Sequence, residues 1–332
     1  MKGDKSPLVV FAEVVDGGKI APCFFETLHA VQKIAEIYES KVHALILGHN
    51  VADIAEDIRH YGIDTIHIAD DACLGAYHPE YYLAAFRQAY EQIRPCAVFM
   101  GHTLQSIDLA PRMAFDLNAG LLTDCTGIEV DSGEVLFLKP VFSSHILAGY
   151  EMKDNPFIVT MRSKSFEPAH RWELKQGTLN IIQVTLHQLQ AKVIITDRVM
   201  RESAGIKVDD AEIIVAGGRG IGSSEGFKVL ADLADTMGAA VGASRPPVDT
   251  GWISAESQVG QTGAIVAPAV YFAIGISGAI QHLAGMSQSK KIIAVNKDAE
   301  ASIFKVADYG AVGVYEEIIP ALTQTIKDNL KA

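Results

Sequence analysis

The sequence predicts an α/β protein of two domains. Residues 1–200 would form an N-terminal α/β domain with a mainly parallel sheet and a β-rich tail, and residues 201–332 a C-terminal doubly wound domain. The chain has 332 residues, and single cores stop growing near roughly 250–300 residues, so two domains are expected. Strand and helix patterns alternate, stop at the charged, weakly periodic residues 197–210 and then begin again. Domain boundaries fall in segments of that kind.

The chain up to Gly101 alternates between strand-like and helical patterns. Apolar residues recur at helical spacing in residues 22–40, where Phe25, Leu28 and Val31 share one face. Such alternation favours right-handed βαβ units around a mainly parallel sheet. Strands are expected at residues 8–14, 42–47, 65–69 and 96–101, and helices at 22–40, 51–60 and 79–92.

Beyond Gly120 the pattern becomes one of strands. Residues 123–130 and 135–142 flank the sequence Asp-Ser-Gly, which indicates a hairpin. Residues 157–162 and 192–196 are further strand-like runs. These four runs make up the predicted β-rich tail.

The second domain repeats the alternation with glycine-rich turns between strands and helices. Open parallel sheets bind ligands beyond the carboxyl ends of their strands, so these turns are the places to look for a site. Strands are expected at residues 212–216, 239–243, 270–274, 291–295 and 312–315, and helices at 223–237, 277–286 and 316–330.

Charge and cysteine content narrow the class of protein. The net charge of −12 would repel a phosphate polyanion, and no Lys/Arg cluster offsets it, so no nucleic-acid partner is expected. The four cysteines stand singly, without a CxxC pair or a Cys/His metal spacing. We therefore expect four small buried residues in a reducing compartment and no metal site.

One long uncharged segment, residues 257–289, raises the question of a membrane. A spanning helix needs about 20 predominantly apolar residues, whereas this segment is interrupted by Pro268, Gly275 and several amides. We expect no membrane insertion, and instead a buried segment that lines a pocket for a large, partly apolar ligand. No signal-peptide pattern precedes the first strand, so a cytoplasmic location is expected.

A glycine-rich turn stands where the second domain would bind a ligand. Residues 217–223 read Gly-Gly-Arg-Gly-Ile-Gly-Ser, after a predicted strand and at the start of a predicted helix. Glycines allow close backbone approach, the helix N-terminus offers N–H groups to a pyrophosphate, and Arg219 adds a fork of donors. The spacing is not Gly-x-Gly-x-x-Gly, because Glu225 stands at the third position, so a tight turn without a ligand is the alternative.

The next strand ends at Ser244 and Arg245. Ordinary NAD-binding folds place Asp or Glu there to accept from the ribose hydroxyls, so NAD bound in that way is disfavoured. Arg245 could contact a 2′-phosphate, which would make the chain an NADP-binding oxidoreductase subunit, or a different anion. A solvated ion pair is the simpler explanation for a single arginine.

Further ligand-type residues follow at later strand ends. Residues 259–263 read Val-Gly-Gln-Thr-Gly, and residues 275–282 read Gly-Ile-Ser-Gly-Ala-Ile-Gln-His. Ser277 is the expected helix N-cap, and His282 would lie in or just past the first turn, where the helix dipole disfavours its protonation. Considered one by one, a core histidine and ordinary caps are the commoner explanations of these residues. The strand predicted at residues 291–295 is followed by Asn296 and Asp298, and Asp308 follows a short helical segment.

Together these segments resemble the alpha subunit of electron-transfer flavoproteins, over about residues 212–315. The run from Gly275 to Met286 is especially typical of that family. The first domain resembles the family more loosely, at residues 121–130 and 156–168.

The resemblance implies that FAD lies in the second domain, with its pyrophosphate near Arg219. It implies that Thr262 bonds flavin N5, that His282 lies on the O2 side and that Arg245 lies near the ring, so that these three tune the redox properties of the flavin. The FAD-binding residues that it implies are Gly218, Arg219, Gly220, Ser244, Arg245, Val259, Gly260, Gln261, Thr262, Gly275, Ser277, Gly278, Ala279, Ile280, Gln281, His282, Asn296, Asp298, Asp308 and Tyr309.

The resemblance also implies an electron carrier that works within an oxidoreductase complex. A beta subunit would pack against the first domain, and electrons would pass between a flavin dehydrogenase, such as an acyl-CoA dehydrogenase, and another redox partner. A complex that splits electrons from NADH between two acceptors is a variant. The residues themselves include no evident Ser-His-Asp, Cys-His or paired-carboxylate arrangement, in agreement with a carrier. An NADP-dependent enzyme and a protein that uses a nucleotide only for structure stay open as alternatives.

Overall fold

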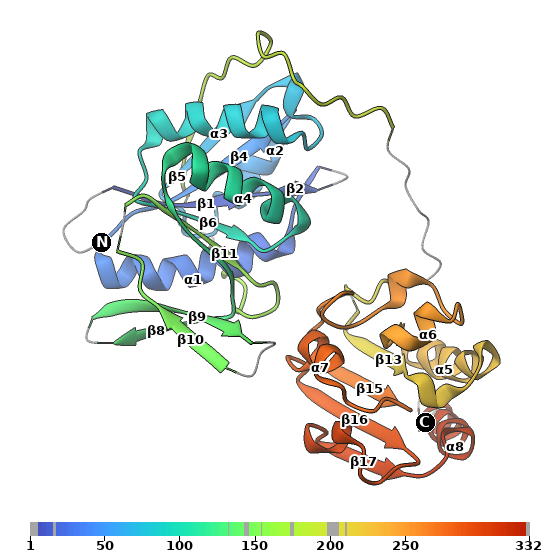
Figure 1. The fold of residues 1–332 in the computed structure, drawn as a ribbon. Helices are drawn as coiled ribbons and strands as arrows, with labels where there is room; N and C mark the ends of the chain where they lie inside the picture. Colours follow the sequence, from blue (N-terminus) through green and yellow to red (C-terminus); the bar gives the residue numbers. More distant parts are fainter. Residues whose placement is uncertain are drawn as a thin grey trace. The chain divides into compact units, whose positions relative to one another are not determined.

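The computed structural model describes residues 6–15, 18–131, 133–142, 146–153, 155–172, 176–197, 206–209 and 211–329. The chain forms two compact units, Met1–Arg198 and Val199–Ala332 (Figure 1). The predicted boundary after residue 200, together with residues 198–205 and 210 of the predicted linker, lies outside the described residues.

The N-terminal unit is built on a parallel sheet of seven strands in the order β12-β5-β4-β1-β6-β11-β7 (Figure 1). The chain runs outward from β1 through β4 to β5 and then crosses to β6 on the other side of β1. This reversal puts a topological switch point between β1 and β6. The strands are β1 (Leu8–Ala12), β4 (Val42–Gly48), β5 (Thr65–Asp70), β6 (Ala97–Gly101), β7 (Gly120–Cys125), β11 (Phe157–Met161) and β12 (Thr178–Ile181).

Helices cover both faces of this sheet. Alternate residues of β1 point to opposite faces, so that Val10 packs in one apolar core and Phe11 in the other. The first core includes α1 (Pro22–Tyr38) and α2 (Ala52–Ile58), and the second includes α3 (Pro79–Ile93) and α4 (Leu104–Leu117). The predicted α/β alternation of the first domain is confirmed, with α4 as an additional helix.

The β-rich tail is confirmed in part. The predicted hairpin is formed by β8 (Gly127–Asp131) and β9 (Glu134–Val141), which pair antiparallel, and β10 (Ile146–Tyr150) joins β9. A strand at residues 192–196 is wrong: these residues form no strand, and Ile194 is 80 % exposed. The sheet edge beside β5 is taken by β12 instead. The remaining short elements are β2 (Val14–Val15), β3 (Lys19–Ile20) and the 3-10 turn η1 (Ala72–Leu74).

The C-terminal unit has a second parallel sheet, in the order β14-β13-β15-β16-β17. Its strands are β13 (Ile213–Gly217), β14 (Ala240–Ala243), β15 (Val270–Ile274), β16 (Lys291–Asn296) and β17 (Tyr309–Val312). One face packs against α5 (Ser224–Met237) and α8 (Tyr315–Asn329), and the other against α7 (Ile280–Met286). The remaining short elements are α6 (Arg245–Asp249), η2 (Arg219–Ile221), η3 (Ala255–Ser257) and η4 (Ser302–Lys305). The doubly wound fold is confirmed, and its switch point lies between β13 and β15.

Two local predictions in this unit are wrong. The last strand lies at Tyr309–Val312 and not at residues 312–315, because the carboxylate of Asp308 accepts a hydrogen bond from Ile292 N–H and starts the pairing earlier. Ser277 is not the N-cap of α7: the helix begins three residues later, after Ala279, which offers no side-chain cap.

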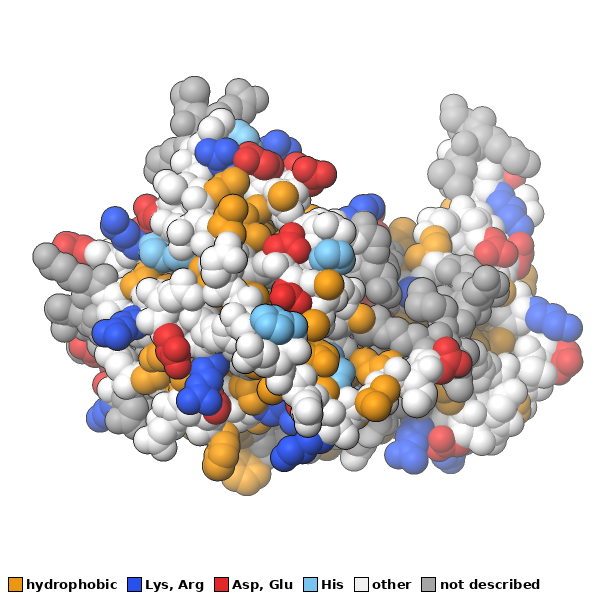
Figure 2. All heavy atoms as spheres, turned by 90° about the horizontal axis from the view of Figure 1, so that it is seen from above, with side chains coloured by type: hydrophobic (Ala, Val, Ile, Leu, Met, Phe, Trp, Pro, Cys, Tyr) orange, Lys and Arg blue, Asp and Glu red, His pale blue; other side chains and the backbone are white. Residues whose placement is uncertain are grey.

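The distribution of charged side chains and the burial of the cysteines can be compared with the expectations from composition. On the face seen in Figure 2, basic side chains are interspersed with acidic ones. Cys23, Cys96 and Cys125 are buried and free, and Cys73 is half-buried. Among the described residues, no helix combines the length and the apolar composition needed to cross a membrane.

Candidate functional site

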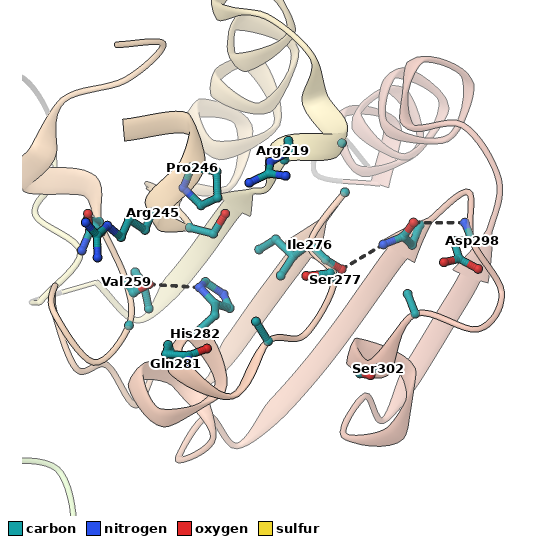
Figure 3. A pocket seen from close by; sticks show the side chains of 18 of the residues that line it. Arg219, Arg245, Pro246, Val259, Ile276, Ser277, Gln281, His282, Asp298 and Ser302 are labelled. Atoms are coloured by element: carbon teal, nitrogen blue, oxygen red, sulfur yellow. Dashed lines mark hydrogen bonds between the residues drawn. The ribbon is translucent and has the colours of Figure 1, made fainter. Parts of the chain in front are cut away.

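A cavity of about 960 Å³ opens at the carboxyl ends of β13, β15 and β16 (Figure 3). Its volume is at the upper end of the roughly 300–1,000 Å³ typical of ligand pockets. It lies at the switch point, where open α/β sheets bind their ligands. The predicted site residues that line it are Arg219, Gly220, Ser244, Arg245, Val259, Gly260, Gln261, Thr262, Gly275, Ser277, Ala279, Gln281, His282, Asn296 and Asp298.

The turns that follow β13 and β15 pack backbone against backbone. Gly218 N–H donates to Ile274 O at 2.8 Å, and Gly220 N–H donates to Gly275 O at 3.0 Å. A Cβ atom on Gly220 would lie 2.9 Å from Cα of Gly275, so a larger residue would push the two turns apart. The predicted glycine-rich turn between a strand and a helix is present, and the Arg219 side chain projects from it toward the cavity (Figure 3).

The two arginines of the cavity differ in their electrostatics. Among the residues that the structure describes, no carboxylate forms an ion pair with Arg219. Arg245 Nε, in contrast, lies 3.2 Å from an Asp249 carboxylate oxygen, and the two side chains are 66 % and 58 % exposed. Arg219 therefore has no carboxylate partner among the described residues, whereas Arg245 forms a solvent-exposed ion pair with Asp249. A contact between Arg245 and an anionic ligand stays a prediction.

His282 is held inside the protein on both ring nitrogens. Nδ1 lies 3.0 Å from Val259 O, and Nε2 lies 3.1 Å from the hydroxyl of the fully buried Tyr271. Burial lowers the pKa of His282 to about 4. The ring is thus neutral near pH 7, and it lines the cavity with both ring nitrogens bonded inside the protein. The expectation that His282 lies on the O2 side of a flavin stays a prediction.

A loop of residues 258–264 forms one wall of the cavity. Gln261 N–H donates to Gln281 O at 2.7 Å, which ties the loop to α7. The Gln258 side-chain amide donates to Thr262 Oγ1 at 3.0 Å. Because Thr262 Oγ1 accepts this bond, its own hydroxyl hydrogen is still available to a ligand acceptor.

Ser244 and Asn296 differ in whether their polar side chains are already bonded inside the protein. Ser244 is buried, precedes α6 without capping it and lines the cavity, so its hydroxyl is open to a ligand. The Asn296 amide donates to Ile276 O at 2.9 Å and accepts from Asp298 N–H at 3.0 Å. Asn296 thus joins two turns that frame the cavity, which accounts for its position without a ligand.

The other predicted site residues do not line this cavity. Asp308 and Tyr309 stand at the amino end of β17, opposite the cavity edge, and Asp308 pairs with Lys291 at 2.8 Å. Their role in FAD binding, which the resemblance implies, stays a prediction. A Cβ atom on Gly218 would clash with Gly275 O, and one on Gly278 would clash with Ile303 N, so both glycines pack against backbone. Ile280 is the first residue of α7.

Several cavity residues were missed in the sequence. Most are neighbours of predicted residues and carry no ligand-type pattern of their own. Gln258 could have been predicted, because it lies four residues before Thr262 and next to the predicted site residues 259–262. The missed lining residues are Pro246, Gln258, Ile276, Lys297, Glu300, Ala301 and Ser302.

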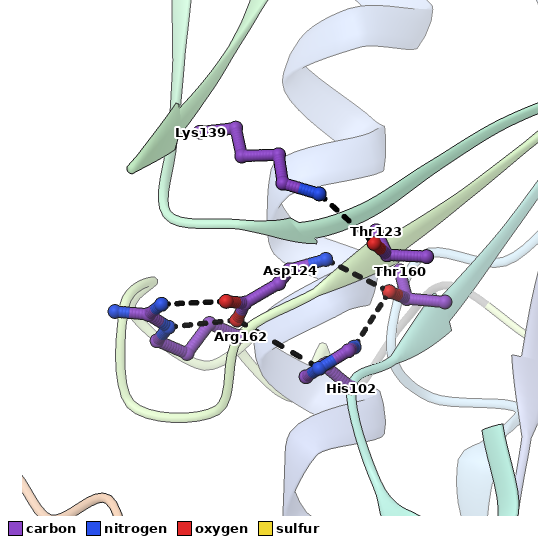
Figure 4. Close-up of polar contacts among 6 residues, drawn as sticks. All are labelled: His102, Thr123, Asp124, Lys139, Thr160 and Arg162. Carbon is purple, nitrogen blue, oxygen red and sulfur yellow. Dashed lines mark hydrogen bonds and ion pairs between the residues drawn. The ribbon is translucent and has the colours of Figure 1, made fainter. Parts of the chain in front are cut away.

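The corresponding strand ends of the N-terminal unit carry a polar cluster that is satisfied internally (Figure 4). Arg162 donates two hydrogen bonds to Asp124, at 2.8 and 2.6 Å. Thr160 Oγ1 accepts from Asp124 N–H at 3.0 Å and lies 2.8 Å from His102 Nδ1. Burial lowers the pKa of His102. These side chains bind one another, whereas the strand ends of the C-terminal unit line an open cavity.

The fold is doubly wound, the cavity lies at its switch point, glycine backbone forms part of the cavity wall, and the Arg219 guanidinium has no carboxylate partner among the described residues. These features are typical of a domain that binds a nucleotide-type cofactor. Residues 207–287 match the family model "Electron transfer flavoprotein FAD-binding domain", and residues 8–188 match "Electron transfer flavoprotein domain". The chain belongs to the family of electron transfer flavoprotein alpha subunits.

Relatives in this family match along almost the whole chain. "Electron transfer flavoprotein subunit alpha" of Bacillus subtilis is 39% identical over 320 residues, which are 96% of this chain and 97% of that protein. "Acryloyl-CoA reductase electron transfer subunit beta" of Anaerotignum propionicum is 36% identical, over 97% of this chain and 96% of that protein. "Lactate dehydrogenase (NAD(+),ferredoxin) subunit LctC" of Acetobacterium woodii is 31% identical, over 96% of this chain and 77% of that protein.

The cavity fits FAD, the cofactor of this family. Its size suits a large ligand, and the backbone floor of Gly220 and Gly275 admits close approach. Arg219 matches a pyrophosphate, and the open hydroxyls of Ser244 and Thr262 match the polar edge of a flavin. The C-terminal unit is therefore an FAD-binding domain. The side chains that would donate hydrogen bonds to FAD lie among the residues that the structure describes.

Proposed function

We propose that this chain holds FAD in the cavity of its C-terminal unit and, as a heterodimer with a beta subunit, carries electrons between a flavin dehydrogenase and a second redox partner. Bound flavin accepts and releases one or two electrons and so supplies the chemistry. The observation that carries the proposal is the unpaired Arg219 on a glycine turn at the switch point.

The residues of the chain would bind and orient the cofactor. Arg219 would hold the pyrophosphate with charge-assisted hydrogen bonds. The wall of residues 258–264 would face the ring, with the Thr262 hydroxyl as a donor toward flavin N5. Arg245 would add a positive field at the mouth of the cavity, weakened by Asp249 and by solvent.

The N-terminal unit would serve as the platform for the beta subunit. Along α4, Leu104 and Phe115 are 88 % and 91 % exposed, and Ile107 is also exposed. Leu104, Ile107 and Phe115 lie at spacings of three and eight residues, close to one side of the helix. Exposed apolar residues gathered on one helix indicate a contact surface for another protein.

The names of the relatives support a carrier within a larger complex. Two of them are called electron-transfer or dehydrogenase subunits. An acyl-CoA dehydrogenase is the flavin dehydrogenase we propose. A second version of this proposal is that the complex splits electrons from NADH between two acceptors. The NAD(+) and ferredoxin in the name of the Acetobacterium woodii relative favour it.

Co-expression of this chain with its cognate beta subunit tests this proposal. The purified heterodimer should be yellow, carry FAD that dithionite bleaches, and pass electrons from a reduced acyl-CoA dehydrogenase to an artificial acceptor. A colourless heterodimer that retains NADP would instead support the oxidoreductase alternative. Addition of NADH alone then separates the two forms, since only the electron-splitting complex is reduced by it.

A further inference from the structure

The Thr262 side chain, in the loop wall of the cavity, has one hydrogen-bond partner among the residues that the structure describes. The Gln258 side-chain amide donates from Nε2 to Thr262 Oγ1 at 3.0 Å. Thr262 is exposed, Gln258 is half-buried, and both line the cavity. The contact between the two side chains therefore lies at the surface that a bound cofactor would meet.

Backbone hydrogen bonds on both sides fix the base of the Gln258 side chain. Gln258 N–H donates to Ala255 O at 3.1 Å, and Gln258 O accepts from Ala264 N–H at 2.7 Å. The next residue, Val259, is buried, and its N–H donates to Ala243 O at 2.8 Å. The backbone thus sets the position of the loop, and the Gln258 amide contributes to the Thr262 hydroxyl instead.

The direction of this hydrogen bond determines what the hydroxyl can do. The amide nitrogen of Gln258 can only donate, so Oγ1 of Thr262 must accept from it. The hydroxyl hydrogen of Thr262 then points away from Gln258 and can be donated to a ligand acceptor. A side-chain oxygen in the place of the amide nitrogen would take this hydrogen and leave Thr262 as an acceptor only.

We propose that Gln258 is a positioning residue that makes the Thr262 hydroxyl a hydrogen-bond donor toward the cofactor. The proposal rests on the proposed function, in which this hydroxyl faces flavin N5. Because N5 is an acceptor in oxidised flavin and carries a hydrogen in reduced flavin, a donating hydroxyl favours the oxidised form. Gln258 therefore lowers the reduction potential of the bound flavin, and it acts through Thr262.

Nuclear magnetic resonance of the FAD-free chain tests the contact itself. The two side-chain amide hydrogens of Gln258 are identified by their absence from Gln258→Met. Thr262→Val keeps the shape of the side chain but removes the acceptor, so one of the two hydrogen signals should move upfield. In the same spectrum the amide signals of Gln324, which donates to Asp328 Oδ1 at 2.8 Å in α8, should stay where they are. Unchanged Gln258 signals in Thr262→Val would overturn the proposal, because the amide nitrogen would then not bind Thr262.

Potentiometric titration of the heterodimer with FAD bound tests the consequence. Gln258→Met should make the binding of oxidised FAD about fivefold weaker relative to reduced FAD, as expected for one neutral hydrogen bond. This ratio corresponds to a rise of about 20 mV in the two-electron potential. The matched control is Gln324→Met, because this exposed glutamine also donates to a side chain four residues further on and does not line the cavity. It should leave the potential unchanged.

A second background separates action through Thr262 from direct contact with the flavin. In Thr262→Val, Gln258→Met should add no further shift of the potential, because the hydroxyl that it orients is missing. A lowered potential, an equal rise in both backgrounds or no shift in either would overturn the proposal. If the unsubstituted chain took up no flavin, the proposed function would fail, while the amide signals of the FAD-free chain would still decide whether Gln258 donates to Thr262.

Discussion

Acidification is predicted to destabilise the C-terminal unit through His282. The folded protein buries this ring in its neutral form, with its pKa lowered to about 4 from an ordinary value of 6.5. The unfolded chain therefore binds a proton more readily than the folded chain between these two values. Stability that is fully present above pH 6.5 is lost as the pH falls toward 4.

The magnitude follows from the two pKa values. A separation of about 2.5 units corresponds to about 3 kcal/mol once the pH is below both values, at about 1.4 kcal/mol per unit. Between pH 7.5 and pH 5 the loss is about 2 kcal/mol. Burial is the main cause of the lowered pKa, so high salt should leave this loss largely unchanged.

Urea unfolding of the FAD-free chain measures this loss. The chain has two tryptophans, Trp172 and Trp252, so a Trp172→Phe background leaves Trp252 fluorescence to report on the C-terminal unit. The comparison is with His282→Gln, which cannot titrate. Its free energy of unfolding should start lower at pH 7.5 but fall by about 2 kcal/mol less on going to pH 5. Parallel losses in the two proteins would refute the reasoning, because His282 would then not be the group that binds the proton.

Three further predictions concern the cavity and the second polar cluster. Arg219→Ala should weaken FAD binding by about 10- to 100-fold, as expected for loss of charge-assisted hydrogen bonds worth about 1.5–3 kcal/mol; titration of the apoprotein checks this, and Lys291→Met, away from the cavity, should bind FAD normally. Arg245→Ala should retain FAD but lower its reduction potential by about 40 mV or less, which corresponds to about 1 kcal/mol for an exposed ion pair, whereas Asp249→Asn should raise the potential; potentiometric titration showing shifts of the same sign would contradict this assignment. Arg162→Ala should destabilise the N-terminal unit by about 3 kcal/mol, because Arg162 is 12 % exposed and its loss removes the guanidinium that pairs with the Asp124 carboxylate; an unchanged urea midpoint for the Trp172 signal would contradict it.

The sequence predicted the fold well where local pattern determines structure. The turn at residues 217–223 was recognisable because glycine and a capping serine, Ser223, are local requirements of a strand-to-helix turn. The helix α4 was not recognised, since Leu104, Ile107 and Phe115 are apolar yet exposed and blur its periodicity. The run at residues 192–196 has strand-forming residues but no strand to pair with.

The features that the sequence did not predict depend on contacts between residues distant in sequence. The role of His282 is set by Tyr271 and Val259, eleven and twenty-three residues away, which no spacing rule brings together. The start of the last strand at Tyr309 was not predicted, because the bond from Ile292 N–H to Asp308 just before it is a tertiary contact. The partner of Arg245 is close in sequence, since Asp249 lies one helical turn further along. The short helix α6 was not predicted because it contains two prolines.

The central claim is that FAD occupies the cavity at the switch point of the C-terminal unit. Hydrogen exchange of the heterodimer, compared before and after one equivalent of FAD is added to the apoprotein, tests it most directly. The account predicts uptake of one FAD per chain, with new protection at residues 217–222, 259–263 and 275–282. Protection elsewhere in the chain, with these three segments unchanged on flavin uptake, would contradict it.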